Sequence, residues 1–79
     1  MSRREQKGPY GIIAYGVDHA VGLFVQVWGN PVYHKTTKGD DPDIDLDKLS
    51  HPDLTMERVI HIADMEAGVQ LTPADFTDL

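Results

Sequence analysis

The sequence predicts an α+β domain, with a three-stranded antiparallel sheet packed by one main helix and a short C-terminal helix. Runs of β-branched and aromatic residues, separated by turn signals, predict the sheet in the first half of the chain. A helix-start signature followed by apolar residues at helical spacing predicts the main helix in the second half. At 79 residues the chain is expected to form a single domain, residues 1–79, with a small core.

The strands are predicted at residues 10–17 (YGIIAYGV) and 23–28 (LFVQVW), whose side chains suit a pleated, half-buried surface. Asp18 and Gly22 supply the turn of a short hairpin between these two segments. A Gly-Asn-Pro turn then precedes residues 32–37, a shorter and more polar segment that we expect to be an edge strand. The pattern therefore predicts an antiparallel meander.

The main helix is predicted to begin after Thr55, a favourable N-cap, with Glu57 in its positive first turn. Apolar residues at helical spacing continue to Ala67, and Gly68 is the expected stop. Glu66 contradicts the pattern, because it falls inside the apolar arc of this helix.

The remaining segments complete the predicted organisation. Thr72, followed by Pro73, repeats the start signal and predicts the short terminal helix. Residues 1–7 are expected to be a flexible basic tail, and residues 38–50 an acidic loop.

Charge is distributed unevenly along the chain. Residues 1–39 hold five Lys and Arg against two Asp and Glu, a net charge of +3, whereas residues 40–79 hold two against eleven, a net charge of −9. An acidic surface repels nucleic acid and attracts basic protein surfaces. The sequence therefore predicts a basic nucleic-acid-binding protein as the partner, and no direct contact with nucleic acid.

Several classes of function are disfavoured by the composition. The chain has no cysteine, and its serines, Ser2 and Ser50, lie in the basic tail and before a His-Pro turn, so we expect no nucleophile and no enzyme. Glycines form no phosphate-cradling run, and no cofactor is expected. The strongest apolar stretch is interrupted by Gln26, which disfavours a membrane segment, and the absence of cysteine fits a reducing compartment. The protein is expected to be a cytoplasmic monomer.

Two groups of residues have the composition of a metal site. The alternating aspartates suit calcium, but loops started at Asp41 or Asp43 lack the glycine at the sixth place and the glutamate at the twelfth. Glu57, His61 and Asp64 share one helical face, where an amphipathic helix places polar residues in any case. No metal site is predicted.

The acidic run DDPDIDLD has two interpretations. In the first it is a solvated loop whose carboxylates prevent aggregation and favour the start of the following helix. In the second it mimics nucleic acid: alternate aspartates of an extended backbone repeat at about 6.6 Å along one edge, while Ile44 and Leu46 dock the row onto the domain. The residues expected to bind a partner are Asp40, Asp41, Asp43, Asp45 and Asp47, extended by Asp53, Glu57 and Asp64.

The aromatic residues give an alternative function. Phe24, Trp28 and Tyr33 form either the packing of a second sheet face or a patch for a partner, as in an antitoxin or an accessory subunit. A DNA-binding helix-turn-helix is disfavoured, because the second helical segment carries Asp75 and Asp78 and no cation.

The segment MSRREQKGPYGIIAYGVDHAVGLFVQVW, followed by the DDPDIDLD run, resembles the anti-CRISPR proteins, small inhibitors encoded by phages and mobile elements. The chain looks most like the compact acidic inhibitors of type I systems, type I-C among them. The resemblance implies a non-enzymatic protein that binds a Cascade-type surveillance complex in the host cytoplasm and prevents recognition of target DNA. Some members of the family do so as DNA mimics. The basic N-terminus departs from a uniformly acidic mimic.

Overall fold

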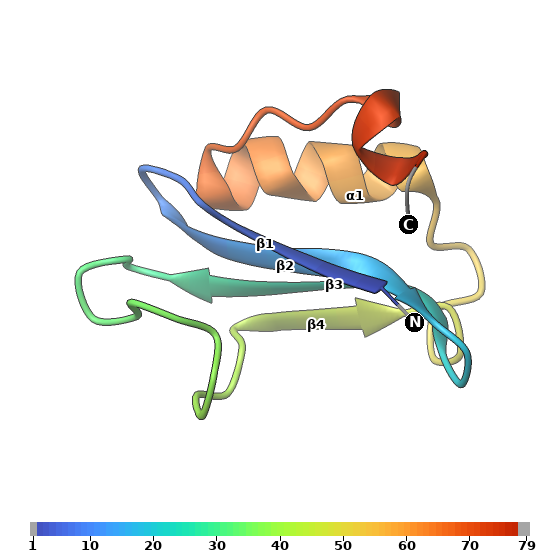
Figure 1. Cartoon of the computed structure of the whole chain (residues 1–79), viewed down its shortest axis with the longest axis horizontal. Coiled ribbons are helices and arrows are strands. Elements are labelled where there is room, and N and C mark those ends of the chain that lie inside the picture. Colours follow the sequence, from blue (N-terminus) through green and yellow to red (C-terminus); the bar gives the residue numbers. More distant parts are fainter. Residues whose placement is uncertain (1, 78–79) are drawn as a thin grey trace.

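The computed structural model describes residues 2–77 and has one antiparallel sheet with a helical layer on one of its faces (Figure 1). The strands are β1 (Ser2–Lys7), β2 (Gly11–Asp18), β3 (Gly22–Gly29) and β4 (Ile44–Asp47), and they lie in the order β1-β2-β3-β4. The helical layer consists of α1 (Met56–Ile62), its π-helical continuation η1 (Ala63–Ala67) and the 3₁₀ turn η2 (Pro73–Phe76). The predicted α+β class, with an antiparallel sheet packed by one main helix and a short C-terminal helix, is confirmed.

The outer strands differ from the prediction, and the sheet has four strands rather than three. Residues 2–7, expected to be a flexible tail, form β1, whose backbone pairs with β2 so that Arg4 lies opposite Tyr15. Met1 of that segment lies outside the described residues. The predicted strand at residues 32–37 is wrong, because these residues form turns and bends.

The fourth strand lies inside the segment 38–50 that was expected to be a loop. Here Ile44 and Leu46 alternate with aspartates, and both aliphatic side chains are partly buried against the core. Burial of two such side chains favours this segment over residues 32–37 as the neighbour of β3, because Val32 and Tyr33 have no comparable alternation and remain exposed.

The main core lies between the sheet and the helical layer. Its buried members from β2 and β3 are Ile13, Tyr15, Val25 and Val27, and those from the rest of the chain are Leu54, Val59, Ile62, Ala63, Ala67, Val69 and Leu71. Full burial of each aliphatic side chain contributes about 1.5–3 kcal/mol. This face of the sheet therefore supplies most of the apolar burial that stabilises the domain.

The predicted helix ends are confirmed. The Thr55 hydroxyl accepts a hydrogen bond from the Arg58 amide at 3.2 Å, and Gly68 ends the helix with a left-handed φ of 70°. Asp75 accepts from the Thr72 amide at 2.7 Å at the start of η2. Glu66, in the π-helical segment η1, is exposed, whereas its neighbour Ala67 is buried, so the glutamate does not enter the core.

The second face of the sheet, which we call the open face, carries no helix (Figure 1). Ile12, Ala14 and Trp28 form a small buried cluster on this face. The Trp28 indole Nε1 donates to the Asp40 carbonyl at 3.0 Å, so the connection between β3 and β4, residues 30–43, folds back over the cluster. Among residues 2–77, no helix is both long enough and apolar enough to cross a membrane.

Candidate partner-binding site

The residues predicted to bind a partner fall into two groups that the structure places apart. Asp40, Asp41, Asp43, Asp45 and Asp47, the sheet-edge acids, lie in the connection before β4 and on β4 itself, which is an edge strand. Asp53, Glu57 and Asp64, the helix-side acids, lie in the connection from β4 to α1 and on the helical layer. The helical layer covers the other face of the sheet, so Glu57 and Asp64 do not continue the row of sheet-edge acids (Figure 1).

Strand β4 shows the alternation that the sequence predicts. Ile44 and Leu46 pack against the main core, and Asp45 and Asp47 point to the opposite side, the open face. The register with β3 places Asp45 opposite Gln26 and Asp47 opposite Phe24. The core therefore holds the backbone of β4, and the backbone fixes the two carboxylates.

Part of the acidic run has a local structural role. One carboxylate oxygen of Asp43 accepts a hydrogen bond from the Gly29 amide at 2.7 Å, and one of Asp47 accepts from the Ser50 amide at 2.8 Å. The first bond joins the chain before β4 to the end of β3, and the second closes the turn that follows β4. They occupy a single oxygen of each carboxylate, so the second oxygen stays available to other donors.

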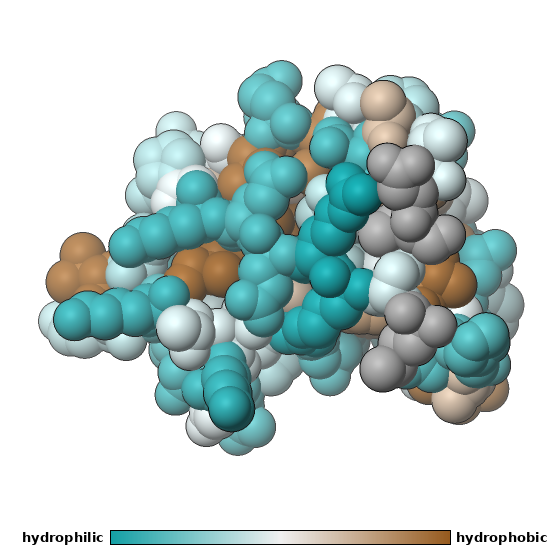
Figure 2. Space-filling view, in the orientation of Figure 1, coloured by the Kyte–Doolittle hydropathy of each residue, from teal (hydrophilic) through white to brown (hydrophobic). Residues whose placement is uncertain are grey.

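Most carboxylates of the row have no cationic side chain within ion-pair distance among the described residues. Within residues 2–77, Asp41, Asp43, Asp45 and Asp47 form no ion pair. Asp40 lies 3.4 Å from the imidazole Nδ1 of His34. The loop that carries the first members of the row protrudes beside the sheet as a largely hydrophilic surface (Figure 2).

A polar network attaches the connection 30–43 to the open face. Thr37, which is 6% exposed, accepts a hydrogen bond from Arg3 Nη2 at 2.9 Å and donates one to Glu5. Arg3 and Glu5 also form an ion pair at 3.3 Å. Because the same connection covers Trp28, leaving it 2% exposed, this indole is not free to contact a partner as the aromatic-face alternative requires.

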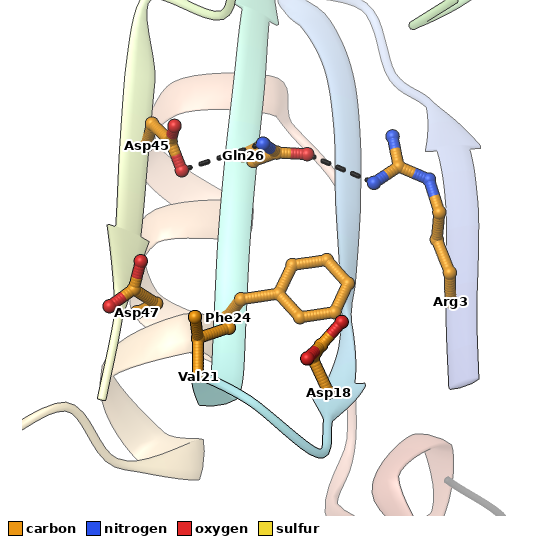
Figure 3. Close-up of a pocket in the computed structure, with 7 residues that line it drawn as sticks. All are labelled: Arg3, Asp18, Val21, Phe24, Gln26, Asp45 and Asp47. Atoms are coloured by element: carbon orange, nitrogen blue, oxygen red, sulfur yellow. Dashed lines mark hydrogen bonds between the residues drawn. The ribbon is translucent and has the colours of Figure 1, made fainter. Parts of the chain in front are cut away.

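Beyond this connection the open face is hollowed into a pocket of about 410 Å³, the open-face pocket. Its lining residues are Arg3, Asp18, Val21, Phe24, Gln26, Asp45 and Asp47 (Figure 3). They come from all four strands and from the β2–β3 turn. The sequence did not indicate Arg3, Asp18 and Gln26 as site residues, because they come together only through the register of the paired strands. The alternation of side chains along β3 and β4 is the one signal that could have related Gln26 to Asp45.

The three helical residues that were weighed as a metal site are not arranged as ligands. Glu57, His61 and Asp64 are all exposed on the helical layer. In the described part of the chain, no group of three or more His, Asp or Glu side chains is arranged to hold a metal ion. The carboxylates of both acidic groups are thus surface groups, suited to contacts with a cationic partner.

In comparisons with known proteins, no family model, no curated protein and no solved structure matches this chain. The sheet-edge acids and the open-face pocket are therefore the features of the molecule from which we infer a function.

Proposed function

We propose that the protein is a non-enzymatic inhibitor that binds a basic nucleic-acid-binding surface of another protein by presenting its sheet-edge acids in place of DNA phosphates. The observation that carries this proposal is the placement of Asp45 and Asp47 on one side of an extended edge strand, without ion pairs to the described cations of the chain. Asp40, Asp41 and Asp43 precede them in the same connection.

The spacing of these charges supports mimicry. Alternate residues of an antiparallel strand repeat at about 6.8 Å, so the strand presents a regular line of negative charges, as a DNA backbone does. A groove lined by Lys and Arg that follows a DNA backbone can therefore contact Asp45 and Asp47 along the same line. Because the core fixes β4, little conformational entropy is lost when the row is bound.

Electrostatics would give this contact its rate and its specificity. The chain carries a net charge of −6, which repels nucleic acid and steers the domain toward cationic protein surfaces. Binding of this kind weakens as salt screens the charges. The resemblance to anti-CRISPR proteins favours a Cascade-type surveillance complex as the partner, and a host cytoplasm as the compartment in which the two would meet.

The test is capture followed by displacement with DNA. The protein is immobilised and exposed at low salt to a lysate of bacteria that carry a type I CRISPR-Cas system, and the captured proteins are challenged with duplex DNA. We expect a nucleic-acid-binding protein to be retained and then released by the DNA, because both ligands use the same basic groove.

The control is a variant in which all sheet-edge acids are replaced by asparagine, the five-Asn variant. Asparagine keeps a side-chain oxygen for the Gly29 and Ser50 amides, so the turns beside β4 are preserved while the charges are removed. We expect the five-Asn variant to capture no protein that is released when duplex DNA is added. Equal capture by both proteins, or a partner that DNA does not displace, would contradict the proposal.

A further inference from the structure

We propose that the open-face pocket receives an arginine side chain of the partner, and that Phe24 together with Asp18, Asp45 and Asp47 recognises its guanidinium. This inference rests on the proposed function for the identity of the partner. It adds to that function a defined contact, with a shape and a chemistry of its own.

One aromatic side chain, Phe24, lines the pocket. The ring of Phe24 is half-buried at the centre of the pocket, with Asp18 on one side and Val21 and Asp47 on the other (Figure 3). The guanidinium carbon of Arg3 lies 6.0 Å from the centroid of this ring, at the distance where a cation is attracted to an aromatic face. The guanidinium of the protein's own Arg3 thus already lies over this ring, at the outer limit of that distance range.

The rim of the pocket is negative, although Arg3 contributes to it. The Arg3 guanidinium donates to the Gln26 side-chain carbonyl at 2.9 Å and to the Thr37 hydroxyl at 2.9 Å, and it is ion-paired with Glu5. Its charge and most of its donors are therefore used within the protein. The carboxylates of Asp18, Asp45 and Asp47 remain as the lining groups without a cationic partner among the described residues.

These carboxylates are held in place before any ligand arrives. Asp18 accepts a hydrogen bond from the Ala20 backbone amide at 2.7 Å, and Asp47 accepts one from the Ser50 backbone amide at 2.8 Å. Asp45 accepts a hydrogen bond from the side-chain Nε2 of Gln26 at 3.4 Å. Each bond uses one oxygen and leaves the other for an incoming donor. A site whose acceptors are fixed in advance loses less entropy on binding.

The geometry favours arginine over lysine. A guanidinium is planar, stacks on an aromatic ring and can donate to two carboxylates at once, whereas an ammonium is a compact, strongly hydrated charge. Asp45 and Asp47 belong both to the pocket and to the row of sheet-edge acids. A basic surface that docks on this row therefore brings its own side chains to the mouth of the pocket.

The test uses a small probe, so that it does not depend on the partner. Backbone amide signals of the isotope-labelled protein are followed by NMR during titration with the peptide acetyl-Gly-Arg-Gly-amide. We expect saturable shifts at Val21, Phe24 and Gln26, weaker binding of the matched lysine peptide, and no saturable shift with the citrulline peptide, which has the shape of arginine without its charge.

Two variants separate the contributions of the ring and the acid. Phe24→Leu keeps an apolar side chain but removes the aromatic face, and should weaken binding of the arginine peptide about three- to tenfold. Asp18→Asn keeps the acceptor for the Ala20 amide and removes one rim charge, with an expected loss of about two- to fivefold. Asp53→Asn removes one charge outside the pocket and should leave the peptide affinity unchanged.

The inference is overturned if the arginine peptide causes no saturable shift at the pocket, if the lysine or citrulline peptide binds as well, or if neither Phe24→Leu nor Asp18→Asn weakens binding more than Asp53→Asn. Such a result would not affect the outcome expected for capture and displacement by DNA, because that experiment depends on all the sheet-edge acids rather than on the pocket. Conversely, peptide binding at the pocket without any partner that DNA displaces would support the arginine site and count against the proposed function.

Discussion

The two faces of the sheet are built by different chemistry. On the covered face, Ile13 and Val25 pack with the helical layer in an apolar core. On the open face, Arg3, Gln26 and Asp45 form a chain of polar contacts across the strands, next to a pocket that Phe24 helps to line (Figure 3). The comparison teaches that the covered face carries the stability of the domain, whereas the open face and its edge present the groups suited to recognition.

The largest expected effect comes from the covered face, and neighbouring isoleucines of β2 allow a matched test. Ile13 is 0% exposed in the main core, and Ile12 is 3% exposed in the small cluster of the open face. Ile13→Ala should lower the free energy of unfolding by about 3–5 kcal/mol and Ile12→Ala by about 2–3 kcal/mol, because the cavity left beneath a loop collapses more readily. Urea denaturation measures both, and equal losses would remove the asymmetry between the faces.

A smaller effect is expected at the indole that holds the connection 30–43. Trp28→Phe keeps an aromatic ring but loses volume and the hydrogen bond to the Asp40 carbonyl, which should cost about 1–3 kcal/mol. Amide hydrogen exchange should accelerate in residues 30–43 more than in α1. Uniform acceleration across the domain would show instead that the connection is part of the main cooperative unit.

The smallest effect on stability is expected at the sheet-edge acids. The five-Asn variant should unfold within about 0.5 kcal/mol of the wild type, because its asparagines keep the turn hydrogen bonds and the replaced side chains are exposed or partly exposed. Urea denaturation of the two proteins checks this. A loss well above that value would mean that the carboxylates hold the fold together, and the division of roles between the faces would fail.

The inner part of the fold could be predicted from the sequence because its signals are local. The runs in β2 and β3, the Thr55 cap and the Gly68 stop each lie within a few residues of the structure that they specify. The outer strands lack such signals. β1 consists only of charged and polar residues, and its place is set by pairing with β2, as in the register of Arg4 with Tyr15.

The candidate site could be predicted only in part, for the same reason. The alternation of Ile44 and Leu46 with aspartates was visible in the sequence, and it correctly indicated that Asp45 and Asp47 share one side. The separation of Glu57 and Asp64 from that row follows from which face the helix covers, a tertiary choice that local patterns do not encode. The pocket depends on the pairing of four strands, which no single segment specifies.

The most direct measurement is the affinity of the captured partner for two variants that lose the same number of charges. One replaces the sheet-edge residues Asp41, Asp45 and Asp47 by asparagine, and the other carries Asp53→Asn, Glu57→Gln and Asp64→Asn on the helix side. We expect the sheet-edge variant to bind at least about tenfold more weakly than the wild type, and the helix-side variant to stay within about threefold. Equal losses would show that net charge alone drives binding, and would contradict a recognition surface at the sheet edge.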